Sequence, residues 1–136
     1  MKTRAVAKNL KISARKLRLA AGLVRGMRVV QAEQVLAVTP KKAAVMTAEV
    51  LKSAVANAEN NNNLRKAALR IEEIRVDEGA TTKRFRPRSR GMANPVLHRT
   101  AHLTIVLTDE AAPEKKPARA HKAAKKEPAV AGKEAK

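Results

Sequence analysis

The sequence predicts an α+β fold in which three helices pack on a small antiparallel sheet, with one long protruding β-hairpin and a disordered C-terminal tail. Three observations carry this prediction. Between residues 13 and 60, apolar side chains recur at helical spacing in three segments. Residues 2–12, 69–78 and 102–108 instead alternate as half-buried strands do. A basic segment with almost no apolar pattern, about residues 79–102, separates the last two strands and is expected to form the hairpin.

The first helix is expected between two residues with characteristic backbone roles. Ser13 occupies an N-cap position, where its hydroxyl can accept a hydrogen bond from a free N–H of the first turn. Gly26 can take the left-handed conformation that ends a helix. A second, short helix is expected around residues 30–37. The apolar face of the first helix consists of Leu17, Ala20, Ala21 and Val24.

The third helix is the longest that the sequence predicts. Thr39 and Pro40 mark its start, because a capping hydroxyl followed by proline is typical of a first helical turn. The helix is expected over about residues 41–60, and the asparagine run at 60–63 favours a turn after it. Much of its apolar stripe is alanine, which lets neighbouring elements approach closely. The stripe consists of Ala43, Met46, Val50, Leu51, Ala54, Val55 and Ala58.

Parity assigns a face to the apolar residues of each strand. In the first strand, Val6, Leu10 and Ile12 share one parity. In the second strand the apolar parity changes at Glu72-Glu73, which indicates a β-bulge. The third strand alternates regularly, with one apolar face formed by Leu103, Ile105 and Leu107.

Charge is distributed unevenly along the chain, whose 136 residues carry a formal net charge of +18. From Gly79 to Thr108 there are six basic residues and no acidic one. A domain on its own gains nothing from such self-repulsion, whereas a polyanion relieves it, so the sequence predicts a nucleic-acid partner. Phe85 is the single aromatic residue, which argues against a reader of single strands that stacks bases on several aromatic side chains.

Four arginines of the hairpin segment fall on every second position. In an extended chain they would share one edge at intervals of about 6.6 Å, which suits a run of phosphates. We call this set the arginine comb; it consists of Arg84, Arg86, Arg88 and Arg90. Lys83 and Arg99 are expected to add phosphate contacts. Because a two-stranded ribbon without a core is marginal in water, we expect the segment to be mobile alone and ordered when bound.

Basic residues also dominate the first helix. They would form either the solvated face of an amphipathic helix or contacts to nucleic acid, and the lack of acidic neighbours favours nucleic acid. These residues are Arg15, Lys16, Arg18 and Arg25.

Catalytic and metal chemistry find little support in the sequence. His98 and His102 would stand about 13 Å apart in a strand. The acidic residues at 72–78 have no matching nucleophile, and cysteine is absent. We therefore expect no enzymatic activity, no metal and no cofactor.

Length and hydropathy limit the expectations for membrane association, export and domain organisation. No apolar run approaches the roughly 20 residues of a membrane span, and Leu19–Val24 is too short for a secretory signal. We expect a soluble chain that is neither exported nor associated with a membrane. Residues 1–110 are expected to form one body that includes the hairpin. Residues 111–136, rich in Ala, Lys, Pro and Glu, are expected to be a disordered tail that acts as an electrostatic tether.

Two segments of the chain carry distinctive motifs. Ser53–Asn60 (SAVANAEN) resembles the end of a helix in the universal L-twenty-two family of large-ribosomal-subunit proteins. The second match is more specific, because Lys83, Arg88–Gly91 (RSRG) and His102–Ile105 (HLTI) agree with the family's hairpin signature in residue type and spacing.

Further agreement lies near the first helix, at Ile12–Lys16 (ISARK) and Arg25-Gly26, so that the similarity spans about residues 2–108. Met92 is a departure, since the family usually has a basic or polar residue there. That departure weakens any expectation of a charged contact at this position of the tip.

The resemblance implies a structural protein of the cytoplasmic ribosome that binds large-subunit (23S-type) rRNA and assists early assembly. It also implies that the hairpin runs inward along the wall of the peptide exit tunnel, where its tip faces the nascent polypeptide near the macrolide site. Neighbouring ribosomal proteins are implied as partners, and self-association is not expected. The tunnel-facing residues would be Arg88, Ser89, Arg90, Gly91, Met92 and Ala93.

Two alternatives stay open at this point. The chain could be a basic nucleoid-type DNA-binding protein, since Lys/Ala/Pro tails also occur there, although it shows no dimerising heptads and no obvious recognition helix. An enzyme acting on RNA is the second alternative, and the missing acid, metal and nucleophile constellation argues against it.

Overall fold

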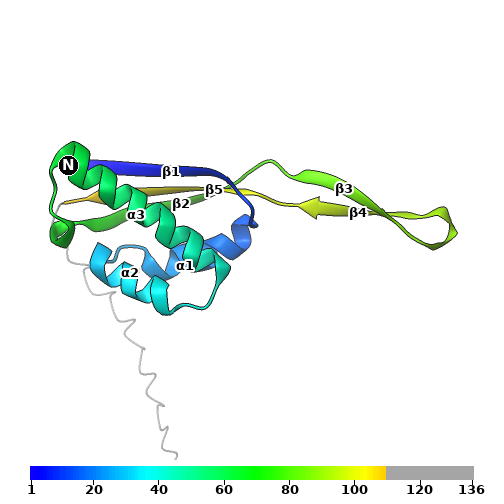
Figure 1. The fold of residues 1–136 in the computed structure, drawn as a ribbon, viewed down its shortest axis with the longest axis horizontal. Coiled ribbons are helices and arrows are strands. Elements are labelled where there is room, and N and C mark those ends of the chain that lie inside the picture. Colours follow the sequence, from blue (N-terminus) through cyan, green and yellow to red (C-terminus); the bar gives the residue numbers. More distant parts are fainter. Residues whose placement is uncertain (110–136) are drawn as a thin grey trace, which may run out of the picture.

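Three helices lie on one face of a sheet from which a hairpin projects, in a computed structural model that describes residues 1–109 (Figure 1). The tail expected at 111–136 lies outside the described residues. The helices are α1 (Ala14–Val24), α2 (Val29–Val38) and α3 (Lys42–Asn62). The strands are β1 (Lys2–Leu10), β2 (Arg70–Glu78), β3 (Thr82–Pro87), β4 (Ala93–His98) and β5 (Ala101–Thr108).

The main sheet is antiparallel and has the order β1-β5-β2, so β5 is central. Ile105 of β5 pairs with Ala5 on one side and with Ile74 on the other. α3 lies against β1 and β5, and α1 lies against β2. The fold class predicted from the sequence is therefore confirmed for the body and the hairpin.

The core lies between this sheet and the helices. Leu17, Leu51 and Leu103 are among the large side chains that are completely buried. Each contributes about 1.5–3 kcal/mol by leaving water. Ala54 and Ala58 of α3 are also completely buried, which is the close approach that the alanine-rich stripe predicted.

The face predicted for Val6 in β1 was wrong, whereas Leu10 packs against the core and Ile12 is buried in it. Thr3 and Ala5 face the core, whereas Val6 is 47% exposed. Small residues occupy the inner face because α3 lies directly against β1, where the amide of Asn62 donates a hydrogen bond to the Thr3 hydroxyl. The pairing of β1 becomes irregular between Ala7 and Leu10.

The helix ends partly match the expected caps. Gly26 is left-handed, with φ 74°, as predicted. Ser13 stands at the N-cap of α1, but its side chain makes no capping hydrogen bond. Thr39 does not cap α3; its hydroxyl instead donates to the Val35 carbonyl (2.7 Å) at the end of α2. Lys41 is the N-cap of α3, and left-handed Asn63 ends that helix.

The strand irregularity predicted at Glu72-Glu73 is confirmed, because the register of β2 on β5 shifts between Ile71 and Glu73. β5 buries Leu103, Ile105 and Leu107 as expected.

The hairpin is a two-stranded ribbon in which β3 pairs with β4 from Thr82↔His98 to Pro87↔Ala93. At its root the Gly79 N–H donates to the Thr100 carbonyl (3.0 Å), and the Thr100 hydroxyl donates to the Ala80 carbonyl (2.8 Å). At its tip the chain reverses through the short 3₁₀ turn Ser89–Gly91. The ribbon extends away from the body (Figure 1).

Candidate nucleic-acid interface

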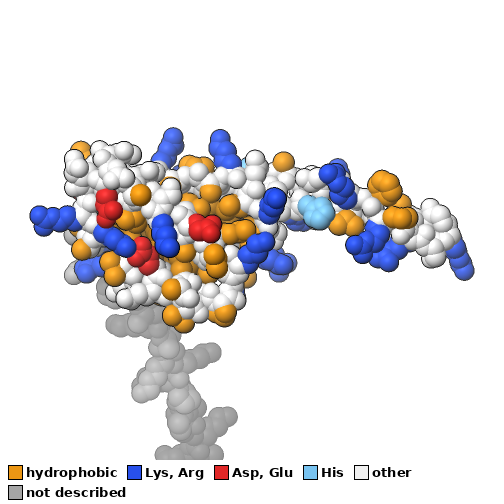
Figure 2. Space-filling model, in the orientation of Figure 1, with side chains coloured by type: hydrophobic (Ala, Val, Ile, Leu, Met, Phe, Trp, Pro, Cys, Tyr) orange, Lys and Arg blue, Asp and Glu red, His pale blue; other side chains and the backbone are white. Residues whose placement is uncertain are grey.

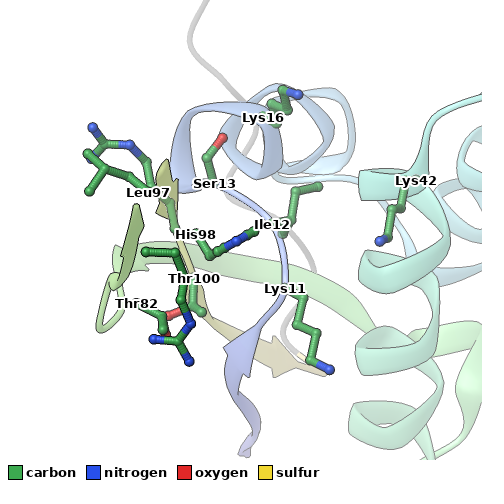
Figure 3. A pocket seen from close by; sticks show the side chains of 11 residues that line it. Lys11, Ile12, Ser13, Lys16, Lys42, Thr82, Leu97, His98 and Thr100 are labelled. Atoms are coloured by element: carbon green, nitrogen blue, oxygen red, sulfur yellow. The ribbon is translucent and has the colours of Figure 1, made fainter. Parts of the chain in front are cut away.

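A hollow of about 890 Å³ lies where the hairpin leaves the body. Its walls come from the loop between β1 and α1, the first turn of α1, the start of α3, and both hairpin strands. Figure 3 shows Lys11, Lys16 and Lys42 on three separate segments around this space. We call it the root hollow; it is lined by Lys11, Ile12, Ser13, Lys16, Lys42, Thr82, Arg84, Leu97, His98, Arg99 and Thr100.

Among residues 1–109, five cationic side chains and no acidic one line the root hollow. Two helices begin at it, α1 after Ser13 and α3 at Lys42, and neither has an acidic residue in its first turn. The amide dipoles at both helix starts therefore add to the positive potential. A space of this size accommodates a nucleotide-sized group, and this charge favours one with phosphate. The five cations are Lys11, Lys16, Lys42, Arg84 and Arg99.

Lys11 and Lys42 were missed as candidate contacts. Lys42 does carry a signal in the sequence, because a cation at the start of a helix opposes the helix dipole and costs stability in an isolated domain. Such a local conflict is typical of functional positions. Lys11 carries no comparable signal, since only the packing of the loop against the hairpin root brings it to the hollow.

A second, smaller hollow of about 300 Å³ also borders the hairpin root. Arg15 and Arg99 both line it, so Arg99 borders both hollows. Glu78 lines it too, which makes this hollow less positive than the first. The structure thus brings Arg15, Lys16, Arg84 and Arg99 together around the root of the hairpin.

The other two predicted helix contacts lie on a different part of α1. Arg18 donates from its guanidinium to the Val76 carbonyl, and Arg25, the C-cap of α1, donates to the Ile74 carbonyl (3.1 Å). Both side chains remain exposed at the surface. Both arginines therefore bind the backbone of β2. Each guanidinium still has further N–H donors for other partners.

The arginine comb is regular only along the strand. Arg84 and Arg86 lie two residues apart in β3, and both are exposed. Arg88 is still extended, and its N–H donates to the Met92 carbonyl (2.7 Å). Arg90 has a left-handed backbone with φ 57° inside the turn, so the expected alternation ends before it. Lys83 occupies the opposite face of β3, as strand parity requires.

Several acidic side chains of residues 1–109 are paired away from the root hollow. Glu72 pairs with Lys2, and Glu33 pairs with Lys66 (2.8 Å). Glu73 accepts a hydrogen bond from Arg75 (2.9 Å). That hydrogen bond, and then the charge of Glu73, raise the pKa of the Arg75 guanidinium above its ordinary value. Figure 2 shows the outcome on one face, where Lys and Arg follow the hairpin and Asp and Glu lie on the body.

Two further observations concern the described part of the chain. Within residues 1–109, no group of three or more His, Asp or Glu side chains is placed to hold a metal ion. Over the same residues, none of the helices combines the length and the hydropathy that crossing a membrane requires.

Comparison with known proteins identifies the family of the chain. The family profile of "Ribosomal protein L22p/L17e" matches residues 5–108. A protein of Pediococcus pentosaceus named "Large ribosomal subunit protein uL22" is 48% identical over 106 residues, which are 78% of this chain and 90% of that protein. A protein of Clostridium novyi with the same name is 48% identical over 111 residues, covering 82% of this chain and 100% of that protein.

A third protein of this name, from Lactobacillus gasseri, is 46% identical over 107 residues, or 79% of this chain and 92% of that protein. The matched residues include α1, the start of α3 and the whole hairpin, which are the segments that form the root hollow. The chain therefore belongs to the ribosomal protein L22p/L17e family, whose members are structural proteins of the ribosome and not enzymes, and it is a protein of the large ribosomal subunit.

Proposed function

We propose that the chain binds large-subunit rRNA through the root hollow and the exposed cations of the hairpin. The observation that carries this proposal is the convergence of five cations from separate segments on a hollow of about 890 Å³ that no acidic residue of the described part of the chain lines. The family relationship supports RNA over other polyanions, since the relatives are named as large-subunit proteins.

The electrostatic repulsion among these cations supports the same proposal. Cations gathered at a protein surface repel one another, and at low salt this repulsion opposes the compact state. A phosphate backbone reverses the sign of that energy and releases its own condensed counterions when it binds. The clustered cations therefore contribute a favourable electrostatic energy only in the complex with RNA. This is expected of a protein that holds RNA segments together during assembly.

The salt dependence of binding tests this proposal. With at least six phosphates neutralised, log affinity for large-subunit rRNA fragments should fall with log salt at a slope steeper than about −4, using roughly −0.7 to −0.9 per contact. A slope near −1 would contradict the proposed interface. Equal affinity for random duplex DNA of the same length would favour the nucleoid-type alternative.

Incorporation into particles gives a second test. Reversing the charge of Arg86 and Arg88 together, with Arg86→Glu and Arg88→Glu, should steeply reduce the fraction of the chain that sediments with large subunits. A matched control reverses Arg4 and Arg65, which are exposed and lie on the body, outside the hairpin. Equal losses in both variants would mean that total charge matters and the position of the charges does not.

We also propose that the hairpin lines the peptide exit tunnel and that residues 88–93 face the nascent chain. The supporting observations are the projection of the hairpin from the body (Figure 1) and its exposed tip. Small residues at the tip, Ser89, Gly91 and Ala93, would keep such a passage open. Met92→Trp adds bulk without a left-handed backbone, since Met92 has φ −73°.

This variant should alter macrolide sensitivity or the stalling of nascent peptides. A conservative control at the same position is Met92→Leu, which keeps the volume and should behave like the parent chain. Parent-like behaviour of Met92→Trp in both assays would mean that the tip does not lie at a constriction.

A further inference from the structure

The two faces of the hairpin carry different chemistry. Side chains directly opposite each other in an antiparallel pair share a face. Arg84 pairs with Val96 and Arg86 pairs with Asn94, so the comb arginines of β3 lie on one face. The other face, which we call the apolar hairpin face, consists of Lys83, Phe85, Pro87, Ala93, Pro95 and Leu97.

The apolar hairpin face is open to solvent. Phe85 is 77% exposed and Leu97 is 45% exposed. Pro87 and Pro95 are exposed as well. Phe85 stands directly opposite Pro95, so a phenyl ring and a pyrrolidine ring project from the same face of the ribbon, with Cβ atoms about 4.5–5.5 Å apart. The one aromatic side chain of the sequence is thus placed in water beside a proline.

Cations lie next to this apolar surface along the strand. Lys83 lies on the same face, and Arg84, Arg86 and Arg88 are sequence neighbours of its residues, with Arg84 and Arg86 on the opposite face. No acidic residue occurs from Gly79 to Thr108. An apolar protein surface placed here would strip water from these charges without giving them a partner, which is costly. A nucleotide offers a flat apolar base together with an anionic phosphate, and so matches both features.

We propose that a nucleobase of the bound RNA stacks on Phe85, with Pro95 extending the platform, while the flanking cations hold adjacent phosphates. This inference rests on the proposed function and identifies a chemical group within the same ligand. Stacking on an aromatic ring tolerates any base, because every base has a π-face. The contact therefore adds affinity and orients the ribbon without reading sequence, in agreement with a chain that has a single aromatic residue.

Substitution of Phe85 tests the stacking contact in binding assays with the full chain and large-subunit rRNA fragments. Phe85→Leu keeps an apolar side chain but removes the ring, and should weaken binding about 5- to 100-fold at each salt concentration. The slope of log affinity against log salt should not change, because no cation is lost. Phe85→Tyr keeps the ring and should bind within about twofold of the parent chain. Arg84→Gln should instead reduce the slope by about 0.7–0.9.

The thermal midpoint of the body should be the same in all these variants, since Phe85 is exposed and lies outside the core. In assembled large subunits, ultraviolet crosslinking should attach a nucleotide to the peptide that contains Phe85, and Phe85→Leu should abolish that adduct.

Three results would overturn the stacking contact. One is unchanged RNA affinity of Phe85→Leu with reduced incorporation into particles, which would mean that a protein surface covers this face. Another is an unchanged affinity and unchanged incorporation, which would leave the face in solvent. The third is a failure of the parent chain to bind rRNA, which would overturn the proposed function as well. A parent slope near −1 with a large effect of Phe85→Leu would overturn the electrostatic interface and support the stacking contact.

Discussion

The guanidinium of Arg18 donates to the backbone carbonyl of Val76 from both Nε (3.3 Å) and Nη2 (3.2 Å). Val76 lies in β2, which is an edge strand because the sheet order is β1-β5-β2. Arg25 makes the equivalent contact two residues earlier, at the Ile74 carbonyl. Edge strands with free carbonyls invite pairing with other chains, so these two arginines close part of that edge.

The beginning of the same edge is closed by backbone instead. The Val29 N–H donates to the Leu69 carbonyl (3.1 Å), and the Ile71 N–H donates to the Met27 carbonyl (2.9 Å). The outer side of β2 is thus occupied at several positions between Leu69 and Val76. This removes one edge of the sheet as a template for a second copy of the chain.

The first prediction separates the four basic residues of the α1 region into two pairs. Arg18→Ala with Arg25→Ala should lower the free energy of unfolding by about 1–3 kcal/mol, because carbonyls of β2 lose charged donors. Arg15→Ala with Lys16→Ala removes the same charge, but these residues line the hollows at the hairpin root. That control should change stability by less than about 0.5 kcal/mol and should weaken RNA binding. Denaturant unfolding and RNA titrations of both double variants test this prediction.

Equal destabilisation of the two double variants would contradict the assignment of Arg18 and Arg25 to the sheet edge. A loss of RNA affinity that is larger for Arg18 and Arg25 than for Arg15 and Lys16 would contradict it too.

The local sequence pattern was sufficient to predict the elements that bury large side chains at regular spacing. The face of α1 with Leu17 and Val24 was predictable because no other periodicity fits it, and the same holds for Leu103 and Ile105 in β5. The inner face of β1 was not predictable. Val6 is more hydrophobic than Ala5, but the closeness of α3 leaves room only for small side chains on that face.

The basic character of the candidate binding surface was predictable from the sequence, but the positions of its residues in the fold were only partly predictable. Arg15 and Arg18 look alike in the sequence, and only the packing of α1 on β2 directs one to the hairpin root and the other to the sheet edge. Lys42 reaches the root hollow because α3 begins beside a hairpin that follows forty residues later in the chain. Such long-range neighbours leave no mark in local periodicity.

The second prediction concerns Lys42. Lys42→Gln should reduce the slope of log affinity against log salt by about 0.7–0.9, because one phosphate contact is lost. Lys52→Gln is a matched control, since it removes the same charge from the same helix at an exposed position that does not line the hollow. RNA titrations at several salt concentrations compare the two. Identical slopes for both variants would show that the root hollow has no special role.

The third prediction concerns the root of the hairpin. A Cβ at Gly79 would overlap the Thr100 hydroxyl oxygen and would lie 3.2 Å from the ring of His102. Gly79→Ala should therefore force that hydroxyl away from the Ala80 carbonyl, to which it donates at 2.8 Å. The loss of this hydrogen bond should cost about 1 kcal/mol and should speed hydrogen exchange at the amide of residue 79.

Thr100→Ala removes the same hydrogen bond from the other side and relieves the overlap. The double variant should thus be less destabilised than the sum of the single variants, by at least about 0.5 kcal/mol in a double-mutant cycle. Strict additivity would mean that Gly79 and Thr100 do not act on each other.

The last prediction concerns the order of the hairpin in the free chain. All of β3 is exposed and β4 has no buried residue, so little apolar burial opposes the loss of conformational freedom, about 1–2 kcal/mol per residue. Amides of β3 and β4 should therefore exchange with solvent almost as fast as unfolded chain, and should become protected when rRNA is added. The amides of Leu103 and Ile105 in central β5 serve as the internal control and should be protected in both states. Hydrogen exchange measured by NMR or mass spectrometry resolves these segments. Strong protection of β3 and β4 without RNA would show that the ribbon is stable by itself and that the partner does not need to order it.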